Sequence, residues 1–278
     1  MATHLDHCTG ADRRVRALRR CARSGTMRCM RLPQASAASL RDGLSGPLRE
    51  LVDRFDETRE PTAAGQASPP LIEEAFNRLF EAMEQTEAAP GAGTGNLPAG
   101  DDVTQLGEYS LELFDHAMQW ANRLELADVF EELQTHAVAM ARWIAAREGR
   151  MTNLEPVVDA LARCANQTRD PGELVALYEA MSETLDATAE VIRRDPEKSN
   201  PARPWRILHL NRAIVATRTH RTDLMEQAFD SLVEQLPEDA PGFFAQGMEQ
   251  MDLLNYPSHV RDVMSRYYRN WSVNRSLH

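Results

Sequence analysis

The placement of helix-breaking residues over residues 102–278 is the feature that most constrains the fold. Prolines, glycines and short polar turns divide this region into eight segments, and apolar side chains recur within the segments at helical spacing. The segments are 103–122, 125–148, 153–168, 172–194, 204–220, 222–236, 241–254 and 257–270. None of them alternates polar and apolar residues as a half-buried strand does, so the pattern predicts an all-α protein.

The connections between these segments are short, and short connections make consecutive helices antiparallel. The eight helices therefore pair into four hairpins, which begin near residues 103, 153, 204 and 241. Helical hairpins that follow one another along a chain stack into an α-solenoid. The pattern predicts stacked antiparallel helical hairpins over 102–278, and it leaves a closed helical bundle as the alternative.

The segment 223–237 carries a resemblance to a known family. It combines the small Ala228 with the large Phe229 and Leu232 and ends in a proline, and so resembles the second helix of a tetratricopeptide repeat. The resemblance covers about one repeat, and the Trp-x2-Leu-Gly-x2-Tyr signature of that family is incomplete. It implies a tetratricopeptide-like body of helical hairpins.

The N-terminal region differs from this body in composition. Residues 1–39 lack helical and strand periodicity and include eight arginines, which predicts a disordered basic arm. An alternative is that part of the arm is an over-extended gene start, with Met27 or Met30 as the true first residue.

Residues 40–101 are predicted to hold two short amphipathic helices with flexible linkers. The first covers 47–58, with Pro47 at the first helical position, and the second covers 69–87. Glycine, proline and alanine dominate 88–101, as is typical of a linker. The second helix could dock on its own chain or on another protein.

Charge and cysteine content exclude several classes of protein. Asp and Glu outnumber Lys and Arg by 42 to 31, so nucleic-acid binding is not expected except through the basic N-terminal arm. The sequence lacks an apolar run long enough for a transmembrane helix, so we expect no membrane partner. The four cysteines show no CxxC spacing, which favours a reduced, cytoplasmic protein without structural disulfides. We also expect no cofactor.

Residues 201–221 form the most unusual stretch, because they hold five arginines and no carboxylate. Apolar side chains cover most of the predicted helix, so it should be buried, and buried cations need partners. One hypothesis is an anion or ligand site; its side chains would be Arg206, His209, Asn211 and Arg212. The alternative is that these arginines fix packing by meeting carboxylates on other helices, such as Glu173, Glu179 or Asp186.

A second candidate is a metal site between the first two long helices. Glu112 and His116 are four residues apart, as are Glu132 and His136, and an antiparallel hairpin would bring the two pairs together. Ordinary pairing on a helix surface explains the same spacing. We treat the metal site as the minor alternative.

The sequence contains no convincing catalytic nucleophile. Cys164 lies on an apolar helix face, and the G-x-S-x-G motif is absent. A non-catalytic helical-repeat scaffold or adaptor that binds a protein or peptide partner is therefore the leading hypothesis. The alternative is a small-molecule-binding, anion-binding or enzymatic helical domain that uses the basic helix 204–220.

Overall fold

Helices dominate the residues that the computed structural model describes, which are 32–63, 65–88 and 99–273. The helices are α2 (Ala37–Thr58), α3 (Pro69–Ala88), α4 (Ala99–Arg123), α5 (Ala127–Ala145), α6 (Glu155–Gln167), α7 (Pro171–Asp186), α8 (Glu190–Arg193), α9 (Pro204–Arg218), α10 (Thr222–Gln235), α11 (Ala240–Leu253) and α12 (Ser258–Val273). Within these residues the β interactions are limited to one isolated bridge between Met151 and Thr188. The prediction of an all-α protein is confirmed.

Local sequence signals set several helix starts. Asp170 precedes α7, and its carboxylate accepts a hydrogen bond from the backbone N–H of Glu173 at 3.0 Å. Prolines occupy the first or second position of α6, α7, α9 and α11, where the missing N–H has no helical partner to lose. Because these signals mark the helix ends, the predicted helices agree with those of the structure within a few residues over most of 99–273.

The segment 172–194 departs from its predicted span because it is divided into α7 and α8. Residues 187–189 leave the helix and bond to the loop after α5 instead. The backbone N–H of Met151 donates to the carbonyl of Ala187 at 2.8 Å, and that of Ala189 donates to the carbonyl of Met151 at 2.9 Å. These two hydrogen bonds to Met151 take the place of helical hydrogen bonds. A local sequence pattern cannot predict them, because the partners are more than 30 residues apart.

Helix α2 begins at Ala37, so the prediction that the first helix starts at Pro47 is wrong. The Ser36 hydroxyl accepts from the backbone N–H of Ser39 at 3.3 Å and caps the helix. Ala37, Leu40 and Leu44 extend the apolar stripe and are fully buried. Residues 37–39, expected in the N-terminal arm, are thus helical. The rest of the arm up to residue 31 lies outside the described residues, as do 89–98 of the predicted linker.

Helices α2 and α3 pack against α4 and α5 of the same chain. The rings of Phe76 and Phe114 meet edge to face at 5.2 Å between centroids, which joins α3 to α4. The indole N–H of Trp120 donates to the carbonyl of Ala67 at 2.8 Å and holds the connection between α2 and α3. The helix predicted at 69–87 therefore docks in cis.

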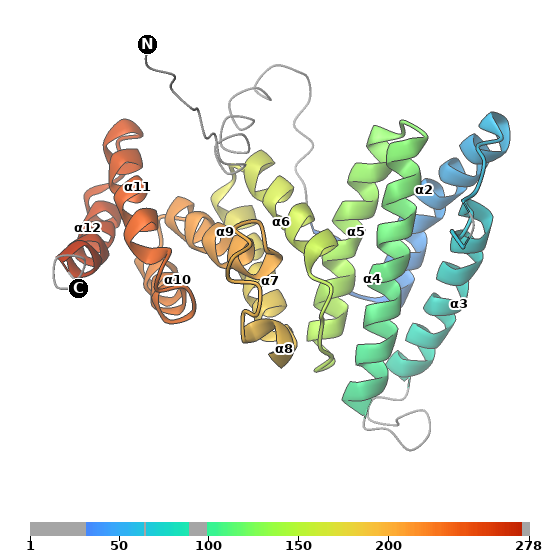
Figure 1. Ribbon diagram of the computed structural model, residues 1–278, viewed down its shortest axis with the longest axis horizontal. Helices are drawn as coiled ribbons and strands as arrows, with labels where there is room; N and C mark the ends of the chain where they lie inside the picture. The colour runs from blue at the N-terminus through green and yellow to red at the C-terminus, as the bar shows by residue number, and fades with distance from the viewer. Residues whose placement is uncertain (1–31, 64, 89–98, 274–278) are drawn as a thin grey trace, which may run out of the picture.

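The helical pairs follow one another along the long axis of the molecule, from α2 and α3 at one end to α11 and α12 at the other (Figure 1). The successive pairs are α2/α3, α4/α5, α6/α7, α9/α10 and α11/α12, and the two helices of each pair contact one another. The main contacts between pairs join neighbours, such as α5 with α7, α7 with α9, and α10 with α12. The buried side chains form a core that continues through all the pairs.

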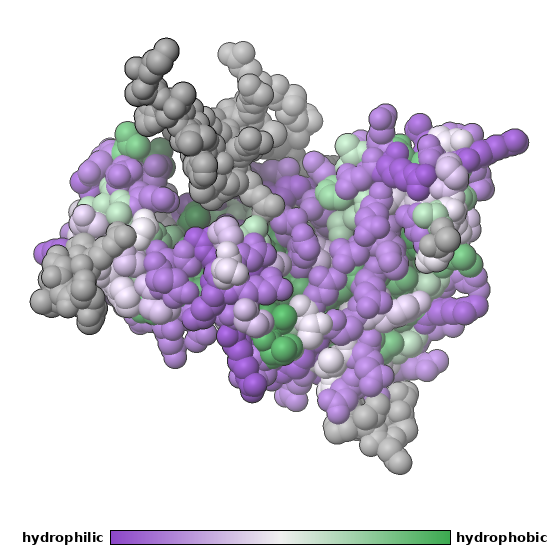
Figure 2. Space-filling model, viewed as in Figure 1, coloured by the Kyte–Doolittle hydropathy of each residue, from purple (hydrophilic) through white to green (hydrophobic). Residues whose placement is uncertain are grey.

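The described surface is mostly hydrophilic on the face that Figure 2 shows, with scattered apolar side chains. The exposed large apolar side chains include Leu71, Val191, Leu253 and Leu254. None of the helices in the described ranges is both long enough and apolar enough to cross a membrane.

Candidate functional site

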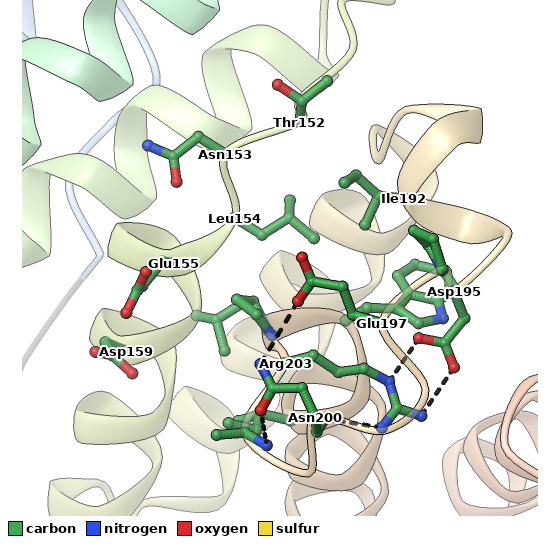
Figure 3. Close-up of a pocket in the computed structure, with 16 residues that line it drawn as sticks. Thr152, Asn153, Leu154, Glu155, Asp159, Ile192, Asp195, Glu197, Asn200 and Arg203 are labelled. Carbon is green, nitrogen blue, oxygen red and sulfur yellow. Dashed lines mark hydrogen bonds and ion pairs between the residues drawn. The ribbon is translucent and has the colours of Figure 1, made fainter.

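A cavity of about 380 Å³ opens between the start of α6 and the irregular segment that joins α8 to α9 (Figure 3). One wall comes from residues 152–159 and the other from residues 192–207. Its volume lies within the range of small-ligand sites in proteins. The cavity borders the N-terminal end of the basic helix α9, which the sequence had singled out.

A buried ion pair shapes the wall formed by residues 195–203. The guanidinium of Arg203 donates to both carboxylate oxygens of Asp195, at 2.5 and 2.8 Å, and each side chain is 5% exposed. Arg203 also donates to the carbonyl oxygens of Lys198 and Asn200, at 3.2 and 3.0 Å. The Arg203 side chain thus closes the 195–203 loop on itself, and its charge is neutralised inside the protein.

The floor of the cavity is apolar and its rim is acidic. Leu154, Val158 and Trp205 are buried, and they line the cavity together with the half-buried Ile192 and Ile207. The rim side chains are exposed carboxylates on both walls, with Glu155 and Asp159 on α6 and Glu197 on the opposite wall (Figure 3). Glu155 and Asp159 share one helix face because they are four residues apart.

Further carboxylates lie beside the α6 wall, on α4. The carboxylate of Asp115 accepts a hydrogen bond from the Asn153 amide at 2.7 Å. Burial raises the pKa of Asp115, and repulsion from Glu155 and Glu112 adds to the increase, although the bond from Asn153 opposes it. Carboxylates of α4 and α6 are therefore close enough to interact on this side of the cavity.

The predicted anion site on α9 is not assembled. Arg206 donates to both carboxylate oxygens of Asp239 at 2.5 to 2.9 Å and to the carbonyl of Pro201 at 2.9 Å. Arg212 donates to the Tyr178 hydroxyl at 3.0 Å and lies over its ring. These two arginines reach α11 and α7 respectively, and neither they nor His209 and Asn211 line the cavity.

The alternative explanation for the arginines of this stretch fits the contacts better. Arg203 meets Asp195 and Arg206 meets Asp239, so both fix packing through carboxylates. The carboxylates differ from the ones we had suggested, because they come from the loop before α9 and the turn before α11. Arg218 instead donates to the backbone carbonyls of Ala165 and Thr168 at the end of α6.

His209 is buried beside Trp205, with ring centroids 4.4 Å apart. Burial lowers the pKa of His209 to about 3, and the charge of Arg212 contributes to the decrease. The Nε2 atom of His209 and the indole Nε1 of Trp205 are buried and have no hydrogen-bond partner among the described residues. His209 is therefore a neutral residue of the core.

The structure does not bring the proposed metal ligands together. The ring Nδ1 of His136 bonds to the backbone carbonyl of Glu132 at 2.8 Å, and its Nε2 lies against Gly43 of α2. Glu112 is exposed on α4. Over the described ranges, no group of three or more His, Cys, Asp and Glu side chains is arranged to hold a metal ion.

Cys164 is 1% exposed, and burial raises the pKa of its thiol. A protonated, buried thiol behaves as a small apolar side chain. This agrees with the structural assignment that the sequence favoured.

Comparison with known proteins adds no assignment, because the chain matches no protein-family model, no curated protein and no solved structure.

The sequence did not predict the cavity. The breaks at Asp195-Pro196, Pro201 and Pro204 marked the irregular segment that forms one wall, and they were read only as helix ends. The opposite wall carried no signal, because Glu155 and Asp159 look like ordinary surface residues of a helix.

Proposed function

We propose that this chain is a non-catalytic helical-repeat protein that binds a protein or peptide partner. The observation that carries the proposal is the pattern of contacts, in which each helical pair packs mainly on the pairs next to it. A solenoid has this pattern, since every repeat buries its apolar face against its neighbours. A stack of this kind presents extended surfaces to which a partner can bind.

The alternative of a closed bundle applies best to the first two pairs. Helices α2, α3, α4 and α5 contact one another in a ring. The three later pairs extend from this unit without returning to α2 or α3 through any major contact among the described residues. We therefore propose a tetratricopeptide-like stack that begins with a four-helix unit.

The proposal is tested by presenting the full-length protein to a displayed library of random twelve-residue peptides. We expect a reproducible class of peptides to be enriched, and the same peptides to bind in solution with one-to-one stoichiometry. Affinity capture from cells that express the protein should in parallel recover a stoichiometric partner. Failure of both experiments would overturn the proposed function.

A small-molecule site is the second candidate function, and the cavity beside α9 is the observation that favours it. An apolar floor with a few polar side chains at the rim is typical of ligand pockets. The acidic rim favours a cationic ligand over the anion first considered. Screening cationic and anionic metabolites by thermal shift distinguishes these two kinds of ligand.

A further inference from the structure

We propose that protonation of His136 releases the first half of α2, residues 37–47, from α5, so that this contact opens in acid. His136 lies on α5 and packs against Gly43 of α2. The inference is independent of the proposed function, because it concerns how α2 is held and not what the protein binds. Its basis is the geometry of the imidazole ring between the two helices.

A hydrogen bond fixes which nitrogen of the neutral ring carries the hydrogen. The Nδ1 atom of His136 lies 2.8 Å from the backbone carbonyl oxygen of Glu132, one turn earlier in α5. Since a carbonyl oxygen only accepts, Nδ1 must be the donor. In the neutral ring the other nitrogen, Nε2, then has no hydrogen and presents its lone pair.

The Nε2 lone pair points at Gly43. A Cβ atom added to Gly43 would lie 2.0 Å from Nε2 and 2.9 Å from each of the ring carbons beside it, Cδ2 and Cε1. Equal distances to both carbons, well beyond the distance to Nε2, place this point in front of Nε2, along the direction of its lone pair. Glycine has only a hydrogen atom in this direction from its Cα, so the neutral ring fits against α2.

Protonation places a second N–H group in the same direction. Its hydrogen would meet the Cα hydrogen of Gly43 instead of an acceptor, and the imidazolium charge would lie between two helices. Both effects raise the free energy of the closed contact. An imidazolium ring therefore favours water over this contact. When it leaves, the start of α2 loses the side chain against which Gly43 packs.

The charged groups around the contact come from three helices. On α5, burial lowers the pKa of His136, while the backbone carbonyl and the carboxylate of Glu132 oppose the decrease. On α2, Arg41 pairs with a carboxylate of α3 at 3.0 Å, and Asp42 is exposed. On α6, Arg163 bonds to the hydroxyl of the residue before the ring at 3.0 Å.

The order of proton uptake sets the direction of the pH dependence. Because the pKa of His136 in the closed contact lies below the ordinary value of 6.5, the released ring takes up a proton first as the pH falls. The closed contact is therefore fully favoured above pH 6.5 and weakens as the pH falls towards the lowered pKa. Opening would expose Leu40 and Leu44 of α2, which are fully buried in the closed structure.

The tautomer of the ring is the first test. In full-length protein labelled with nitrogen-15 in its histidines, long-range proton–nitrogen NMR spectra distinguish the two ring nitrogens by chemical shift. The signals of His136 are those that the substitution His136→Gln removes. At pH 7.5 we expect them to report a hydrogen on Nδ1 and none on Nε2. A neutral ring with its hydrogen on Nε2 would overturn the proposal.

Hydrogen exchange measured by mass spectrometry tests the release itself. Labelling times at pH 7.5 and 5.5 are scaled for the intrinsic pH dependence of amide exchange. We expect protection of residues 37–47 in the wild type to fall by up to about tenfold per pH unit below pH 6.5. His136→Gln should remove this dependence, because glutamine does not titrate. Gly43→Ala should remove it as well, because the added methyl group displaces the ring at every pH.

His116→Gln is the matched control, because it removes another half-buried histidine of the four-helix unit, on α4. It should keep the wild-type dependence. His209 is present in all three variants, so its titration cancels when they are compared. The same fall in protection in the wild type and in His136→Gln would overturn the proposal, as would an equal fall throughout the chain. Loss of protection that is confined to α2 and depends on His136 supports it.

Discussion

At the scale of single residues, charge burial distinguishes structural from surface groups. The Arg203–Asp195 pair is the most enclosed ion pair among the described residues, with both side chains 5% exposed. The Arg261–Asp252 pair lies on the surface, with its side chains 41% and 66% exposed. Removing one partner of a buried pair leaves an uncompensated charge, whereas water solvates the survivor of an exposed pair.

Asp195→Asn should therefore lower the free energy of unfolding by about 3 kcal/mol. Asparagine keeps the left-handed backbone of this position, where φ is 50°, so the change tests the charge and not the turn. Urea denaturation measures the effect, and Asp252→Asn should cost less than about 1 kcal/mol. Similar decreases in the free energy of unfolding for Asp195→Asn and Asp252→Asn would show that Arg203 is not structural.

The buried His209 should make the free energy of unfolding depend on pH. Burial and Arg212 lower its pKa from 6.5 to about 3, so the folded protein holds it neutral. Between these two values the unfolded chain binds a proton that the folded protein does not bind. Stability should therefore fall as pH falls from 6.5 towards 3.

His209→Leu should flatten this profile, because leucine does not titrate. Urea denaturation at pH 7.5, 5.5 and 4.5 measures it. The wild type should lose up to about 1.4 kcal/mol per pH unit more than the variant below pH 6.5. His259→Gln removes an exposed imidazole and serves as the control, with the wild-type profile expected. Parallel profiles for the wild type and His209→Leu would contradict the assignment.

At the scale of elements, the local sequence pattern predicts where helices form. It does not predict which residues of two helices come close together when the helices pack. In α2, Gly43 lies so near the ring of His136 on α5 that an added Cβ would overlap its Nε2. Gly242 in α11 has open space where a Cβ would be added. Both glycines lie within helices, and they differ in what lies beside them.

Gly242→Ala should stabilise the protein by about 0.5–1 kcal/mol through helix propensity. Gly43→Ala should destabilise it, because His136 must leave its bond to the carbonyl of Glu132. Melting temperatures of the two variants should shift in opposite directions. The double change Gly43→Ala with His136→Ala should recover part of the loss, and a failure to recover would mean that the close contact is not the cause.

At the scale of the whole molecule, the neighbour-to-neighbour contacts predict local rather than global responses. Phe244 is fully buried in the last pair, with its ring 5.2 Å from that of Phe229 and 5.4 Å from that of Tyr267. These rings join α11 to α10 and α12. The four-helix unit α2–α5 has no major contact with them in the part of the chain that the structure describes.

Phe244→Ala should cost about 3–5 kcal/mol locally. Hydrogen exchange measured by mass spectrometry should show lost protection in α10–α12 and little change in α2–α5. Phe76→Ala in α3 is the reciprocal control and should spare α10–α12. Uniform loss of protection in either variant would indicate one cooperative core and would argue against the proposed stack.

The sequence by itself determined most of the helices, the buried character of α9 and the absence of a usable thiol at Cys164. These properties depend on spacing along a few turns of chain, and prolines and caps mark their limits. Only the tertiary structure decided the partners of the arginines and the place of the cavity. Arg206 meets Asp239 across 33 positions, and Glu155 and Glu197 line the same cavity between α6 and the α8–α9 segment. Such pairs arise from how helices stack, because side chains distant in sequence meet only after the apolar faces are buried.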